Sequence, residues 1–85
     1  MQCFVYKSVR KADTYVFLRE SEAFAVLPPE LAERLGELAF VIEIDLSPQR
    51  KLAREDVTVV MANLAERGYH LQLPPPPELL LSGDA

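Results

Sequence analysis

The stretch that decides this fold is Gly68-Tyr69-His70-Leu71-Gln72-Leu73-Pro74-Pro75-Pro76-Pro77. Gly68 suits the end of a preceding helix, because a helix commonly ends in a residue with positive φ, which glycine adopts without steric cost. From Tyr69 to Leu73 apolar and polar residues alternate, which predicts a strand. The four prolines supply no backbone N–H, so we expect the strand to end at Leu73 and a stiff polyproline II rod to follow.

Length and composition predict one globular domain. The chain has 85 residues, of which 49% are hydrophobic, and a formal net charge of −4 at pH 7. We expect a single domain over residues 1–85 with an ordered core of about residues 2–77. Cys3 is the only cysteine, which excludes an internal disulfide and fits a reducing cytoplasm. A transmembrane helix needs about 20 apolar residues, and no apolar run in the sequence approaches this length. We therefore expect a cytoplasmic protein without a membrane segment.

Polarity patterns, glycines and prolines divide the rest of the chain into elements. The sequence predicts strands at 2–8, 14–19, 38–46 and 69–73, and helices at 29–36 and 54–67. The first two strands are apolar on both faces and joined by a short polar segment, which favours an antiparallel hairpin of inner strands. The order strand, strand, helix, strand, helix, strand is typical of a small α/β domain, with an α+β arrangement left open and a proline-rich tail after the last strand.

The third predicted strand alternates in polarity, and this alternation determines the predicted core. One of its faces should carry Leu38, Phe40, Ile42, Ile44 and Leu46. Its other face becomes polar toward the end of the strand. Combined with the other elements, this pattern predicts a buried core made of Val5, Phe17, Phe40, Ile42, Val60, Met61, Leu64 and Leu71.

Three segments resemble the YcgL-domain family of small bacterial proteins. They are Cys3–Ser8 with Arg10-Lys11 and Thr14-Tyr15, then Arg50-Lys51-Leu52, and finally the Gly68–Pro77 stretch. The resemblance covers nearly the whole chain, and its last segment is the most specific. It implies an α/β/α sandwich. It brings no established active site, so it predicts the fold and leaves the function open.

Five basic residues form the first candidate site, which would bind an anion. These residues are Lys7, Arg10, Lys11, Arg50 and Lys51. If their two segments met at one end of the sheet, the converging cations would suit phosphate or carboxylate. The alternative is ordinary solvated turns whose charges are neutralised by Asp13 and Asp45.

The aromatic and proline residues offer a second candidate, a docking site for a partner. Pro74 and Pro77 have the spacing of a PxxP ligand, and Tyr69 lies beside them in sequence. The alternative is that the rod serves the domain itself, by packing on its own aromatics and stopping further strand pairing. The tyrosines at 6, 15 and 69 would be stacking faces for nucleic-acid bases, or else core aromatics with a solvated hydroxyl.

Evidence for catalysis is weak. Glu43 and Asp45 share a strand face and could bind a divalent ion or act as acid and base, although pairing with Arg50 or Lys51 is the simpler interpretation. His70 stands apart from other catalytic or ligating residues. We therefore predict no catalytic residue, metal or cofactor.

Together these patterns predict a non-enzymatic binding or adaptor domain that acts through a protein or nucleic-acid partner such as RNA. The alternative is a small enzyme or metabolite-binding protein that uses the basic edge for an anionic ligand.

Overall fold

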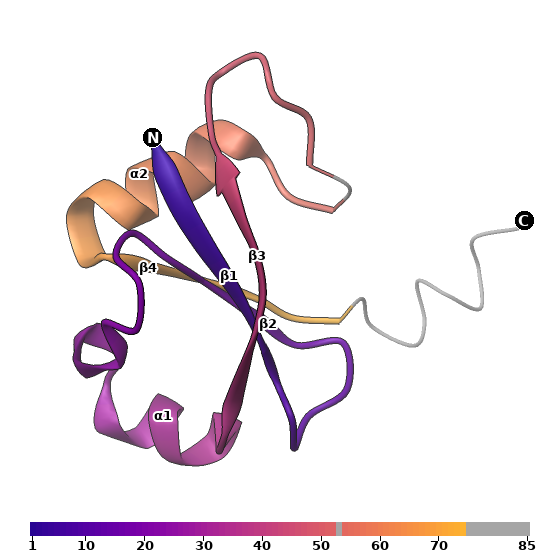
Figure 1. The fold of residues 1–85 in the computed structure, drawn as a ribbon, viewed down its shortest axis with the longest axis vertical. Coiled ribbons are helices and arrows are strands. Elements are labelled where there is room, and N and C mark those ends of the chain that lie inside the picture. The colour runs from indigo at the N-terminus through magenta and orange to yellow at the C-terminus, as the bar shows by residue number, and fades with distance from the viewer. Residues whose placement is uncertain (53, 75–85) are drawn as a thin grey trace, which may run out of the picture.

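The protein is described by a computed structural model that covers residues 1–52 and 54–74 (Figure 1). Its elements are strand β1 (Gln2–Ser8), strand β2 (Tyr15–Leu18), the 3₁₀ helix η1 (Phe24–Val26), helix α1 (Pro29–Leu35), strand β3 (Leu38–Asp45), helix α2 (Val57–Arg67) and strand β4 (Tyr69–Gln72). The predicted order of strands and helices is confirmed. The predicted extension of the ordered core to residue 77 and the prolines from Pro75 to Pro77 lie outside the described residues.

The four strands form one sheet in the order β3-β1-β2-β4. All three pairings are antiparallel, so the mixed α/β fold takes the α+β form that the sequence left open. β1 and β2 are the inner strands, as their two apolar faces predicted. The helices cover opposite faces, with α1 and η1 on one and α2 on the other, which makes the expected α/β/α sandwich.

Local signals set the ends of the helices. α1 begins at Pro29 and ends at Gly36, whose φ of 66° is favourable only for glycine. α2 ends at Gly68 in the left-handed conformation, with its N–H donating to the Leu64 carbonyl. The predicted start of α2 at residue 54 is wrong, because the Asp56 carboxylate accepts the backbone N–H of Thr58 and caps the helix there.

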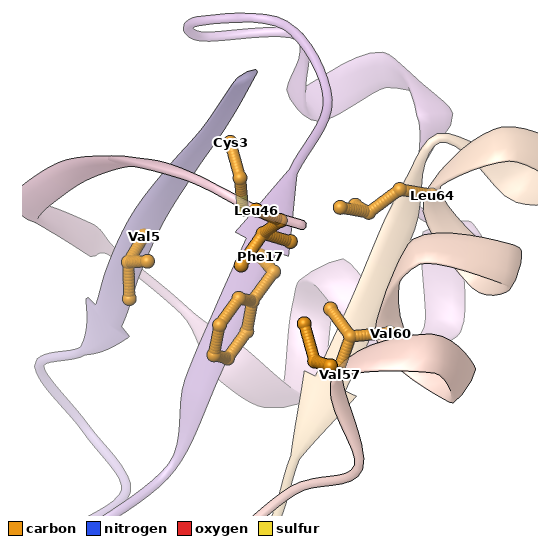
Figure 2. Packing of buried hydrophobic residues seen from close by; sticks show 7 residues of the cluster. All are labelled: Cys3, Val5, Phe17, Leu46, Val57, Val60 and Leu64. Atoms are coloured by element: carbon orange, nitrogen blue, oxygen red, sulfur yellow. The ribbon is translucent and has the colours of Figure 1, made fainter. Parts of the chain in front are cut away.

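The core consists of two clusters, one on each face of the sheet. Figure 2 shows the cluster under α2, which is made of Cys3, Val5, Phe17, Leu46, Val57, Val60 and Leu64. The cluster under α1 is made of Tyr6, Val16, Leu18, Leu27 and Leu35. Successive residues of β1 and β2 point to opposite faces, so each inner strand contributes to both clusters.

The single apolar face predicted for the third strand is wrong, because a β-bulge divides it. Val5 pairs with Ile42 and Tyr6 with Phe40, so Val41 is an extra residue without a partner on β1. A bulge of this kind reverses the faces of the residues beyond it. Leu38 therefore packs with the α1 cluster, whereas residues 44 and 46 pack with the α2 cluster.

The predicted burial of Phe40 and Ile42 is wrong as well, since they are 57% and 50% exposed. β3 is an edge strand, so its side chains have a neighbouring strand on one side only. Burial is confirmed for Val5, Phe17, Val60 and Leu64, whereas Met61 and Leu71 are only partly buried.

Candidate interaction surface

The five basic residues of the candidate anion site lie in two separate groups. Each of them is exposed: Lys7, Arg10, Lys11, Arg50 and Lys51. In the pairing of β1 with β3, Ser8 lies opposite Leu38 and Gln2 lies opposite Asp45. The turn after β1 and the segment after β3 therefore leave opposite ends of the sheet, about 20 Å apart at about 3.3 Å per residue. In Figure 1 they lie at the lower and upper ends. The structure does not bring the five residues together.

Arg10 has a structural contact of its own. Its guanidinium donates a hydrogen bond of 2.9 Å to the carbonyl of Glu33 in the last turn of α1. The same group lies over Gly36, where an added Cβ would come within 3.1 Å of it. A cation at this end of a helix satisfies a carbonyl that lacks an intrahelical partner. Arg10 thus ties the β1–β2 turn to α1.

The aromatic and proline candidates are only partly available to a partner. Tyr69 is half-buried against the α1 cluster, whereas Pro74 is exposed and Pro77 lies outside the described residues. Tyr6 is buried on the α1 face, where its hydroxyl accepts the N–H of Glu22. Tyr15 packs on the other face, so the three tyrosines do not form one stacking platform.

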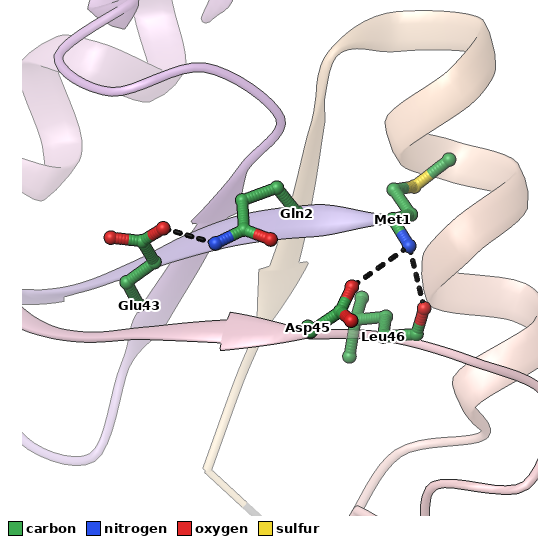
Figure 3. Close-up of polar contacts among 5 residues, drawn as sticks. All are labelled: Met1, Gln2, Glu43, Asp45 and Leu46. Carbon is green, nitrogen blue, oxygen red and sulfur yellow. Dashed lines mark hydrogen bonds and ion pairs between the residues drawn. The ribbon is translucent and has the colours of Figure 1, made fainter.

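Glu43 and Asp45 are engaged by the start of β1 rather than by the predicted arginine or lysine (Figure 3). The Gln2 side-chain amide donates to the Glu43 carboxylate. The amino group of Met1 lies 3.1 Å from Asp45 Oδ1 and donates to the Leu46 carbonyl at 2.7 Å. Among residues 1–52 and 54–74, no group of three or more acidic, histidine or cysteine side chains is placed to hold a metal ion.

His70 does not stand alone as the sequence suggested. Its Nε2 lies 2.6 Å from Glu55 Oε1, and its Nδ1 lies 2.9 Å from the Asn63 side-chain nitrogen. Its ring packs edge-to-face on Phe17, with centroids 5.7 Å apart. An amide nitrogen can only donate, so Nδ1 accepts from Asn63 and Nε2 carries the proton that Glu55 accepts. Both ring nitrogens are thus hydrogen-bonded, and His70 connects β4 to α2 through Asn63 and to the segment before α2 through Glu55.

The most distinctive surface is the outer edge of β3. Phe40, Val41 and Ile42 are consecutive residues with exposed fractions of 57%, 45% and 50%. In the described parts of the chain, β1 is the only strand that pairs with β3. Backbone groups on the outer side of an edge strand are free to pair with another chain, and natural proteins protect such edges with prolines, charged side chains such as lysine, bulges or a covering segment. β3 contains neither proline nor lysine, and its protective features are the bulge at Val41 and the acidic residues Glu43 and Asp45.

An aromatic group extends this edge onto the α1 face. Tyr6 packs edge-to-face against Phe24 and Phe40, with ring centroids 5.1 and 5.6 Å away. Phe24 comes from η1 and is 37% exposed. The buried ring of Tyr6 is therefore flanked by two exposed rings, Phe24 from η1 and Phe40 from β3. We call the exposed side chains of Phe24, Phe40, Val41 and Ile42 the β3 edge surface.

A hollow of about 340 Å³ opens on the same face, where α1 leads into β3. It is lined by Phe24, Leu27, Ala32, Gly36, Glu37 and Leu38. Apart from Glu37, this lining is apolar, as is usual in pockets that bind small apolar groups.

The polarity alternation of the third strand gave no indication of the β3 edge surface, because it predicted Phe40 and Ile42 in the core. One available signal was Val41, which is apolar on the face that the alternation made polar. The strand order, which leaves β3 at the edge, has no local signal.

Comparison with known proteins identifies the family. A family model described as the YcgL domain matches residues 3–75. A YcgL domain-containing protein of Thioalkalivibrio sulfidiphilus is 49% identical over 75 residues, which cover 88% of this chain and 93% of that protein. The chain belongs to the YcgL domain family. Another YcgL domain-containing protein, from Xanthomonas campestris, is 46% identical over 74 residues, covering 87% of this chain and 86% of its own length.

A third YcgL relative, from Ectopseudomonas mendocina, is 43% identical over 76 residues, covering 89% of this chain and 78% of its own length. The YcgL match runs from β1 through β4, so the sheet, both helices and the β3 edge surface all lie within the family region. The resemblance expected from the sequence is thereby confirmed. In the described residues, no helix is long and apolar enough to cross a membrane.

Proposed function

We propose that this YcgL-domain chain is a non-enzymatic binding or adaptor domain, and that a protein partner docks on the β3 edge surface by adding an extended strand to β3. The observation that carries the proposal is the run of exposed apolar residues Phe40–Ile42 on an edge strand that contains neither proline nor lysine. In strand addition, main-chain hydrogen bonds supply affinity and side-chain contacts supply specificity. A cytoplasmic location, supported by the unpaired Cys3, is part of this proposal.

The energetics of the surface support docking. Covering the exposed halves of three large apolar side chains contributes about 2–4 kcal/mol. An added strand also pairs backbone groups that otherwise bond to water. The neighbouring strand β1 is packed on both of its faces, so this edge is already formed before a partner binds. A preformed edge loses little conformational entropy when a partner binds.

A protein partner is favoured over a nucleic acid by the distribution of charge. The segments that carry the two basic groups leave opposite ends of the sheet. The guanidinium of Arg10 is already hydrogen-bonded to α1. The β3 edge surface itself is apolar, and β3 carries Glu43 and Asp45 and no basic residue, which disfavours phosphate.

The test is selection of short random peptides, displayed on phage, against the full chain. Binding of the selected peptides is then measured to the wild type and to two variants, Val41→Lys and Val59→Lys. Val59 is the matched control, because it is an equally exposed valine, at 49%, on α2. We expect Val41→Lys to weaken binding about tenfold or more, which corresponds to about 1.4 kcal/mol, and Val59→Lys to leave it unchanged.

Two outcomes would contradict the proposal. The first is that no peptide is enriched, or that both variants weaken binding equally. The second is tight binding of a single-stranded RNA whose affinity falls steeply with salt and is unaffected by Val41→Lys, because this would assign the function to a nucleic-acid partner.

A further inference from the structure

The hollow beside β3 lies where a docked strand would direct side chains. Leu38 lines the hollow and belongs to the α1 cluster, and Phe40 contacts Tyr6 of the same cluster. Both residues therefore point to the α1 face of the sheet. A strand added to β3 would lie about 4.8 Å farther out, with successive side chains on alternate faces. Its residues opposite Leu38 and Phe40 would thus project toward the face on which the hollow opens.

The chemistry of the hollow selects an apolar group. Its lining includes the side chains of Phe24, Leu27, Ala32 and Leu38, and its volume of about 340 Å³ exceeds that of one large aliphatic or aromatic side chain. Burying a leucine-sized group in such a site removes apolar surface from water on both partners. A polar side chain would lose hydration there, and Glu37 is the one polar side chain in the lining that could bond to it.

Charge around the edge discriminates between occupants. β3 and the residue before it carry Glu37, Glu43 and Asp45 and no cation. Two cations lie beside this strand, because Lys7 pairs with Ala39 and the Arg10 guanidinium lies over Gly36, so three carboxylates outnumber two cations at this edge. All three carboxylate side chains are exposed, and among the described residues only Asp45 forms an ion pair, with the amino group of Met1. A segment with basic residues on both sides of its apolar part would complement these carboxylates.

Two other occupants are disfavoured by the same charges. In an antiparallel pair of β3 strands from two copies, the end that carries Glu37 would approach the end that carries Glu43 and Asp45, so like charges would meet. The chain's own last residues, 75–85, contain Glu78 and Asp84 and no lysine or arginine. Both occupants would thus add negative charge to an edge that is already acidic.

We propose that the β3 edge binds an extended segment of another protein in which one bulky apolar side chain enters the hollow and is flanked by lysine or arginine residues. This inference rests on the proposed function, because it assumes docking on β3. It adds two features to that function. The hollow binds the bulky apolar side chain, which we call the anchor, and the carboxylates of Glu37, Glu43 and Asp45 favour basic flanking residues, which we call the charge filter.

The probes are synthetic fluorescent peptides with alternating valine and threonine, a central leucine and a lysine at each end. A second peptide carries a central alanine, and a third has glutamates in place of the lysines. Binding to the full chain is measured by fluorescence anisotropy at low and at high salt. We expect either change to weaken binding about tenfold, and the effect of the glutamates to shrink at high salt.

Filling the hollow provides the matched comparison. Ala32→Leu places extra carbon atoms in the hollow, whereas Ala62→Leu makes the same change at an exposed site on α2. The Ala32→Leu variant should bind the leucine peptide no more tightly than the alanine peptide. The Ala62→Leu variant should still bind the leucine peptide more tightly. If Ala32→Leu fails to fold, NMR of the wild type decides, because the leucine peptide should shift the methyl signals of Leu27 and Leu38.

The outcomes separate this inference from the proposed function. Equal binding of the leucine and alanine peptides, with binding still lost in Val41→Lys, overturns the anchor and leaves docking on β3 intact. Stronger binding of the glutamate peptide overturns the charge filter. Failure of every peptide to bind, or an unaffected Val41→Lys variant, overturns docking on β3 itself.

Other occupants would also be visible. A dimer in sedimentation that Val41→Lys dissociates would identify a second copy as the occupant. A large gain in peptide affinity on deleting residues 75–85 would identify the chain's own tail. Each of these results overturns the inference.

Discussion

Replacing Phe17 and Phe40 by alanine, one at a time, tests whether the bulge and the strand order place these two rings in different environments. Phe17 lies on inner strand β2, is 5% exposed and contacts the His70 ring. Phe40 lies on edge strand β3 and is 57% exposed. On sequence alone both rings belong to the core, so equal losses would be expected.

The structure predicts unequal losses. Removing a buried phenylalanine side chain costs about 3–5 kcal/mol, which is the loss expected for Phe17→Ala. Phe40 has less than half of its surface buried, which accounts for about 1 kcal/mol. Its edge-to-face contact with Tyr6 adds about 0.5–1.5 kcal/mol. The expected loss for Phe40→Ala is therefore about 1.5–2.5 kcal/mol.

The free energy of unfolding is measured by urea titration, followed by far-UV circular dichroism, and the slopes are compared to verify two-state behaviour. In thermal melts each kcal/mol corresponds to about 4–8 °C for a domain of this size. A Phe40→Ala variant that loses as much stability as Phe17→Ala would refute the assignment of β3 to an exposed edge. It would also remove the basis for the β3 edge surface.

Two further predictions concern pH and stability. The carboxylate of Asp56 accepts hydrogen bonds from Thr58, first from its side chain and then from its backbone, and these bonds lower the pKa of Asp56. The ionised Asp56 carboxylate therefore stabilises the fold above about pH 4, where free aspartate titrates, and this stabilisation is lost as the pH falls further. Asp56→Ala should be less stable than the wild type at pH 7 and equally stable in acid. A gap in urea midpoint that persists in acid would contradict this. Burial raises the pKa of the Cys3 thiol from 9.0 to about 11, so the neutral thiol should stabilise the fold below pH 9 and lose this effect between about pH 9 and 11. Cys3→Ala should remove this part of the pH dependence of stability. Cys3 in the folded protein should also react with iodoacetamide far more slowly at pH 8 than Cys3 in the unfolded chain does. Equal reaction rates, measured by mass spectrometry, would refute the burial of Cys3.

The candidate sites show how far sequence reasoning carries. The basic residues were recognised by type, yet their distribution over two ends of the sheet depends on the β1–β3 register. Likewise, Glu55 and Asn63 meet His70 only because α2 packs over β4. The spacing of residues along the chain does not show which side chains of a helix and the following strand will meet.

Most elements of this protein follow from local sequence, because glycine, proline and polarity patterns act through neighbouring residues. Gly36 and Gly68 end the helices, runs of apolar strand-forming residues mark β1 and β2, and alternation marks β3 and β4. Tertiary structure alone decided the faces. The extra residue Val41 reverses the side-chain alternation of β3. Among the described residues β3 pairs with β1 alone, so the backbone groups on its outer side are unpaired. Both effects arise from hydrogen bonds between residues thirty or more positions apart, so local alternation alone could not place Phe40 and Ile42 on an exposed edge.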